Sequence, residues 1–101
     1  PVVAAGGDGV ISVTSNATPR LMARLVECAA GGDLPGAREI HYRLTPWMHA
    51  AFVESNPLPV KAALAMMGRI QNVLRLPLVP MSDVHDALVR ASLVAAEAIA
   101  R

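Results

Sequence analysis

A single convincing β-strand, with nothing beside it to pair with, is the feature that most constrains this chain. Residues 6 to 16 read GGDGVISVTSN, in which the β-branched Val10, Ile11 and Val13 stand between glycines and turn-forming residues. The apolar side chains fall on both faces, as in a parallel sheet that is covered on both sides. Because no other segment predicts a strand, its backbone N–H and C=O groups have no partners within the chain. We therefore expect the rest of the sheet to lie upstream of Pro1.

The remaining chain predicts helices, from apolar residues at helical spacing and from capping residues. Thr18 and Asp33 are suited to begin helices, and the glycines at 31 and 32 are suited to end one. Pro46 lies inside the second helix and should bend it without dividing it. The predicted helices cover residues 18 to 31, 33 to 53, 59 to 67, and a segment that begins at Ser82.

The apolar spacing also predicts which helix faces are buried. On the second helix the inner face is expected at four-residue intervals, at Ile40, Leu44, Met48 and Phe52. On the third it is expected at Val60, Leu64 and Met67. On the last it is expected at Val84, Leu88, Ala91 and Ala95. The proline-rich stretch from residue 74 to 80 is expected to run over an apolar surface.

Composition excludes several classes of protein. Nine Lys and Arg against eight Asp and Glu give no basic surplus, so neither nucleic acid nor an anionic membrane is an expected partner. With 53% apolar residues, disorder is not expected, and no uncharged run is long enough to span a bilayer. The single cysteine, Cys28, cannot form an internal disulfide, which fits a reducing compartment. We therefore expect a cytoplasmic location.

The residues that could carry chemistry have plainer structural interpretations. The glycine cluster at residues 6 to 9 precedes the strand, whereas phosphate loops follow one, so a tight turn is expected. The three histidines, His41, His49 and His85, lack the spacing of a zinc site, and neither a metal nor a cofactor is expected. Cys28 is expected to act as a small hydrophobic residue rather than a nucleophile.

Two basic residues stand in apolar surroundings. Lys61 is the only lysine, and an amine among apolar residues raises the possibility of a Schiff base. The favoured interpretation is a helical lysine that reaches a nearby carbonyl or acid. Arg75, between two leucines, is expected to reach a carboxylate or a helix end.

Three blocks of the sequence suggest a family. GGDGVISVTSN at 6 to 16, FVESNPLPVKAAL at 52 to 64 and LRLPLVPMS at 74 to 82 resemble, in order and spacing, the C-terminal third of the dihydrodipicolinate synthase and N-acetylneuraminate lyase family of pyruvate-dependent class I aldolases. The resemblance covers nearly the whole chain. LRLPL favours the synthases within the family.

The resemblance implies an α/β fold, namely the C-terminal portion of a TIM (β/α)8 barrel plus an appended all-α domain, with the isolated chain mostly helical. Residues 1 to 32 would be the last βα unit, with residues 10 to 14 as the eighth strand, and residues 33 to 101 the helical domain. The lone strand would then be paired in the whole barrel.

The resemblance also implies an activity for the whole enzyme. A lysine on the sixth strand would form a Schiff base with pyruvate, which then condenses with aspartate semialdehyde on the route to diaminopimelate and lysine. That lysine and the proton-relay residues lie before the eighth strand, so this chain holds no catalytic residue and should be inactive alone. Its expected partners are the remainder of the barrel and, in a homo-oligomer such as a homotetramer, further copies.

One substrate-binding element carries over by resemblance. Ile11 matches the residue whose backbone carbonyl faces pyruvate and the Schiff base. The other matching positions are expected to be structural, fixing the hinge and docking the helical domain onto the barrel: Asn56, Pro57, Pro59, Lys61, Arg75 and Pro77.

Two alternatives stay open. The chain could belong to another pyruvate-dependent aldolase of the family, of the N-acetylneuraminate lyase type. It could also be a non-catalytic helical interaction module, whose apolar strand and helix faces pair with another copy or with a separate barrel chain.

Overall fold

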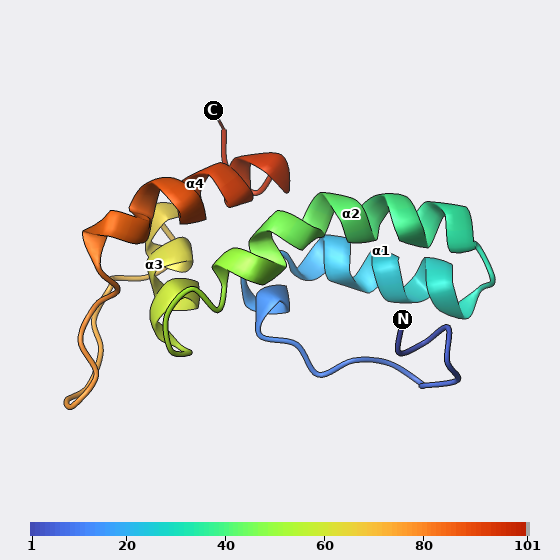
Figure 1. The fold of residues 1–101 in the computed structure, drawn as a ribbon, viewed down its shortest axis with the longest axis horizontal. Coiled ribbons are helices and arrows are strands. Elements are labelled where there is room, and N and C mark those ends of the chain that lie inside the picture. The colour runs from blue at the N-terminus through green and yellow to red at the C-terminus, as the bar shows by residue number, and fades with distance from the viewer. Residues whose placement is uncertain (101) are drawn as a thin grey trace.

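The computed structural model describes residues 1–100, and its regular elements are helical. Four α-helices follow one another along the chain (Figure 1). They are α1 (Pro19–Ala30), α2 (Leu34–Ala50), α3 (Leu58–Met66) and α4 (Asp86–Ala95), with short 3-10 helices η1 (Thr14–Asn16) and η2 (Asp83–His85) before α1 and α4. The order and number of the predicted α-helices are confirmed.

The strand expected over residues 10 to 14 is not formed. This segment runs past α1 without regular structure, and Thr14 turns into η1 (Figure 1). The described residues supply no second strand, and a strand without a hydrogen-bonded neighbour gains nothing that offsets the cost of ordering it. The strand is therefore absent because it has no neighbour, although its residues favour a strand.

Helices α1 and α2 form an antiparallel pair joined by a tight turn (Figure 1). Gly32 has a φ of +82°, a left-handed conformation that glycine adopts without strain. The carboxylate of Asp33 then accepts a hydrogen bond from the backbone N–H of Gly36 at 3.0 Å, as predicted for a residue that begins a helix.

Pro46 lies inside α2, and the helix continues through it. The prediction of one helix rather than two is confirmed, but α2 ends at Ala50 and not at Val53. Of the predicted inner face, Leu44 is fully buried while Phe52 lies beyond the helix and is exposed. Trp47, which was not predicted, is the largest fully buried side chain.

Helix α3 begins at Leu58, one residue earlier than expected, and ends before Gly68. Gly68 has a φ of +67°, which suits a residue that ends a helix. The loop that follows projects away from the helices before returning to α4 (Figure 1). Within the described chain it does not run over an apolar surface, because Leu76 and Val79 are exposed.

Helix α4 buries a different face from the predicted one. The core side of η2 and α4 holds Val89, Ser92, Leu93 and Ala96, all buried. The predicted inner residues, Val84, Leu88, Ala91 and Ala95, are all exposed instead. Apolar residues occupy both sides of this helix, so spacing alone could not choose between them.

Residues from α2, α3 and α4 form the main core. Its fully buried members include Trp47, Ala63, Val89 and Leu93. A second cluster, centred on Leu44, lies where α1 packs against α2. None of the helices described here has the length and apolar character needed to cross a membrane.

Candidate functional site

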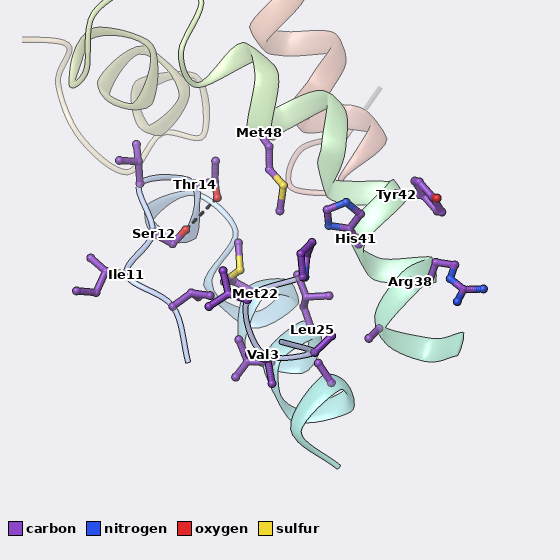
Figure 2. A pocket seen from close by; sticks show the side chains of 18 of the residues that line it. Val3, Ile11, Ser12, Thr14, Met22, Leu25, Arg38, His41, Tyr42 and Met48 are labelled. Carbon is purple, nitrogen blue, oxygen red and sulfur yellow. Dashed lines mark hydrogen bonds between the residues drawn. The ribbon is translucent and has the colours of Figure 1, made fainter. Parts of the chain in front are cut away.

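An apolar groove lies between residues 1 to 14 and the α1–α2 pair (Figure 2). Its volume is about 660 Å³. The floor is formed by side chains such as Met22 and Leu25 of α1 and Met48 of α2. Its few polar side chains come from Ser12, Thr14, Arg38, His41 and Tyr42. A groove of this size and character on a small chain indicates a surface that another polypeptide segment covers.

Hydroxyl groups shape the end of the groove near η1. The side-chain oxygens of Ser12 and Thr14 lie 3.0 Å apart (Figure 2). The hydroxyl of Ser15 donates to the carbonyl of Ser12 at 2.8 Å, and the Ser12 hydroxyl accepts from the Ser15 N–H at 3.1 Å. These short-range bonds turn the chain into η1 without a neighbouring strand.

The carbonyl of Thr14 is the best-connected polar group of this region. It accepts hydrogen bonds from the indole N–H of Trp47 at 3.0 Å and from the hydroxyl of Thr18 at 3.0 Å. Trp47 and Thr14 are both buried. The groove's inner end is thus fastened directly to α2.

Ile11, the predicted substrate-binding residue, lies at the open rim of the groove (Figure 2). Its side chain is fully exposed. Neither the backbone nor the side chains of Asp8 to Ile11 make a hydrogen bond to any other described residue. The main-chain groups of a β-branched segment thus face solvent, which is the condition of a sheet edge without its neighbour.

The glycine cluster before this segment forms a turn, as predicted. Gly6 has a φ of +100°, and the N–H of Gly7 donates to the carbonyl of Val2 at 2.9 Å. The hydrogen bond closes the turn.

Lys61 donates a hydrogen bond from Nζ to the main-chain carbonyl of Val73. The interpretation of Lys61 as a helical lysine that reaches a carbonyl is confirmed. The bond ties α3 to the start of the projecting loop. Arg75 lies in that loop, exposed, and its side chain makes no hydrogen bond or ion pair with residues 1–100, so the contact predicted for its guanidinium is absent there.

The structural positions predicted from the family motifs divide into two groups. Asn56, Pro57, Pro59 and Lys61 lie together where the chain enters α3, and Pro59 is fully buried there. Arg75 and Pro77 are exposed in the projecting loop.

Glu54 joins the entrance of α3 to the beginning of α4, a contact that sequence reasoning missed. Its Oε1 lies 2.7 Å from Nδ1 of His85 and accepts the backbone N–H of Ser82 at 2.9 Å. These two hydrogen bonds, that from His85 first, hold the pKa of Glu54 below its ordinary value of 4.5. A separation of 31 residues leaves no local spacing that could have indicated the pair.

Within residues 1–100, no three His, Cys, Asp or Glu side chains gather as metal ligands would. Cys28 is half-buried on α1.

Comparison with known proteins decides the family. The sequence profile of the dihydrodipicolinate synthetase family matches residues 1–96. The chain belongs to this family. It is 52% identical over 88 residues to the 4-hydroxy-tetrahydrodipicolinate synthase of Methanocaldococcus jannaschii, covering 87% of this chain and 30% of that protein. It is 53% identical over 97 residues to the synthase of Acidithiobacillus ferrooxidans, covering 96% of this chain and 33% of that one.

Solved structures of the family share the fold. The dihydrodipicolinate synthase of Thermotoga maritima superposes with a TM-score of 0.93 at 50% identity, over 97% of this chain and 33% of that one. The chloride-inhibited synthase of Acinetobacter baumannii, solved with pyruvate, superposes with a TM-score of 0.92 at 36% identity, over 97% and 34%. The chain thus spans about a third of the length of the family members it matches. The resemblance stated from the three sequence blocks is confirmed.

Proposed function

We propose that this chain works as part of a 4-hydroxy-tetrahydrodipicolinate synthase. That enzyme is a lyase that condenses pyruvate with aspartate semialdehyde through a lysine Schiff base, in lysine and diaminopimelate biosynthesis. The proposal is supported by the family membership and by relatives of that name at about half identity.

The unpaired segment from Asp8 to Ile11 is the observation that carries the proposal. It includes Val10 and Ile11, the first two residues of the predicted strand, and it has no hydrogen-bonded neighbour among the described residues and an apolar groove beside it. A TIM barrel supplies what is missing, because its strands pair on both edges and its helices cover the outside. Residues 1 to 32 then act as the last βα unit and residues 33 to 101 as the helical domain.

Ile11 contributes its main-chain carbonyl to the site in this proposal. Active sites of TIM barrels lie at the carboxyl ends of the strands, where a carbonyl dipole can face a bound substrate or an amine. The exposed, unpaired backbone at Ile11 leaves that carbonyl available.

The nucleophilic lysine belongs to the part of the enzyme outside these residues. Lys61 is the chain's only lysine, and its Nζ donates a hydrogen bond to the Val73 carbonyl. The whole enzyme is a cytoplasmic homo-oligomer in this proposal, and Asn56, Pro57, Pro59, Lys61, Arg75 and Pro77 shape and dock its helical domain.

Reconstitution tests the proposal. The 101-residue chain is co-expressed with the Thermotoga maritima synthase from which the matching third has been removed, and the mixture is treated with pyruvate and borohydride. We expect the reduced pyruvate adduct on the Thermotoga part and not on the 101-residue chain. Aspartate semialdehyde should be consumed only when both parts are present. Cleavage of N-acetylneuraminate in place of that condensation would assign the chain to the lyase branch of the family.

Lys61→Arg is the matched control. Arginine keeps a hydrogen-bond donor for Val73 and cannot form a Schiff base, so the adduct should persist unchanged. A borohydride-trapped adduct on Lys61 of the 101-residue chain would contradict the proposal.

A further inference from the structure

The projecting loop between α3 and η2 is held to the helices near both of its ends. Near its start, Lys61 donates a hydrogen bond from Nζ to the main-chain carbonyl of Val73. At its end, the N–H of Ser82 donates to the carboxylate of Glu54 at 2.9 Å. Both ends of the loop therefore have a fixed place on the helical part of the chain.

Arg75 stands at the turn of this loop with an unpaired side chain. The N–H of Leu78 donates to the carbonyl of Arg75 at 3.0 Å, which closes the turn. Arg75 is exposed, and its guanidinium makes no hydrogen bond or ion pair with residues 1–100. The neighbouring Leu76 is 86% exposed. The loop therefore presents a cation from a defined position.

The region around Arg75 is cationic, although the whole chain has nine Lys and Arg against eight Asp and Glu. Residues 55 to 82 contain no Asp or Glu. They contain three basic residues, Lys61, Arg69 and Arg75. The flanking acid, Glu54, is already hydrogen-bonded at the end of the loop. Because a local excess of positive charge raises the concentration of small anions nearby, this region favours an anionic ligand.

The ends of the loop lie beside the carboxyl end of the segment that predicts a strand. Val13 and Leu74 both pack against the main core, in which Met81 is buried. Helix η1, which follows Val13, contacts α3. In Figure 1 the loop extends toward the side of α2 on which residues 1 to 13 lie. With residues 10 to 14 as the last barrel strand, the loop would rise from the rim of the carboxyl face, where the sites of TIM barrels lie.

We propose that Arg75 draws the anionic substrates of the whole enzyme toward the mouth of its barrel. This inference rests on the proposed function, which supplies the substrates, since pyruvate and aspartate semialdehyde each carry a carboxylate. The role differs from docking of the helical domain. A steering cation acts through its charge alone, whereas a docking guanidinium depends on the planar, bidentate geometry that lysine lacks.

Substitution of Arg75 in the reconstituted enzyme tests the role of its charge. Arg75→Met keeps an aliphatic chain without the charge, and Arg75→Lys keeps the charge without the planar geometry. The rate of borohydride-trapped adduct formation is measured at pyruvate concentrations below saturation. We expect Arg75→Met to lower this rate about threefold at about 0.01 M ionic strength, and Arg75→Lys to retain it. At about 1 M salt, where charges act over only about 3 Å, all three enzymes should agree.

Steady-state kinetics and a matched control separate steering from a structural role. For the condensation we expect KM to rise in Arg75→Met while kcat stays unchanged. Arg24→Met removes the same charge from an exposed position of α1 and should leave the rates unchanged. An unaltered adduct rate in Arg75→Met at low salt would overturn the proposal. A loss that persists at high salt, or that Arg75→Lys shares, would also overturn it.

Photocrosslinking tests the position of the loop separately. A photoreactive benzophenone residue replaces the exposed Leu76 in the reconstituted enzyme. We expect it to label segments of the Thermotoga part that directly follow barrel strands. Labelling only of segments that precede the strands, or no labelling of that part, would overturn the placement.

The two proposals fail in different ways. Absence of a pyruvate adduct in the mixture with the wild-type chain would refute the assignment as a synthase. An adduct that forms at a rate independent of the charge at position 75 would refute only the steering by Arg75.

Discussion

The indole N–H of Trp47 donates a hydrogen bond of 3.0 Å to the main-chain carbonyl of Thr14. Trp47 lies in the last turn of α2, and Thr14 is the residue at which the unpaired segment enters η1. Both residues are buried, so water does not compete for the bond. This one contact fixes the segment that carries Ile11 to the helical part of the chain.

Two substitutions of Trp47 should separate the contribution of its hydrogen bond to stability from the contribution of its packing in the core. Trp47→Phe removes the donor but keeps an aromatic ring, and should lower the free energy of unfolding by about 1 to 3 kcal/mol. Trp47→Ala also removes the ring from the core and should cost about 3 to 5 kcal/mol. Urea denaturation measures both. Tyr42→Phe, at an exposed ring of the same helix, is the control, and a loss equal to that of Trp47→Phe would refute the role of the bond.

Glu54 should make stability depend on pH in the acid range. Its pKa is lower in the folded chain than its ordinary value of 4.5, so the folded state binds its proton less readily than the unfolded state. The carboxylate therefore contributes stability that is fully present above pH 4.5 and is lost as the pH falls through the lowered pKa.

The measurement for Glu54 is the thermal midpoint as a function of pH. We expect the wild type to lose more stability below pH 4.5 than Glu54→Gln, because the amide has no proton to gain. Glu39→Gln, at an exposed position of α2, is the control and should follow the wild type. Parallel curves for the wild type and Glu54→Gln would show that the contacts with His85 and Ser82 do not stabilise the fold.

Two leucines of α4 should differ sharply in their effect on stability. Leu93 is fully buried, so Leu93→Ala should cost about 2 to 5 kcal/mol. Leu88 is half exposed on the outer side, so Leu88→Ala should cost less than about 1 kcal/mol in dilute solution. Urea denaturation compares the two variants. Equal losses would contradict the burial of Leu93 in preference to Leu88.

Lys61 should protect the projecting loop. Lys61→Met removes the hydrogen bond to Val73, and a loss of about 1 kcal/mol raises the population of the opened loop about fivefold. Trypsin cleavage after Arg75, followed by mass spectrometry, should accelerate by a similar factor. Arg24→Met, at an exposed position of α1, removes a cation elsewhere and should leave the rate unchanged. An unchanged cleavage rate in Lys61→Met would show that the hydrogen bond to Val73 does not protect the loop.

The sequence by itself determined the local structure and the family. Prolines and glycines with strict conformational preferences mark the helix boundaries, and Asp33 caps α2 through a neighbour three residues away. The three motif blocks identified the family, since short motifs in fixed order are a property of the sequence alone. The β-branched residues at 10 to 14, with no other strand predicted in the sequence, also indicated that this segment needs a partner strand.

Only the tertiary structure decided which faces are buried and which distant groups meet. Helix α4 is apolar on two sides, and packing against α2 and α3 selected Leu93 rather than Leu88. The contacts of Trp47 with Thr14 and of Glu54 with His85 join residues that are 33 and 31 positions apart in the sequence. The spacing of residues along the chain does not indicate that such distant positions meet. The segment with Ile11 stays unpaired because backbone hydrogen bonds need a second strand, and residue preference cannot replace that partner.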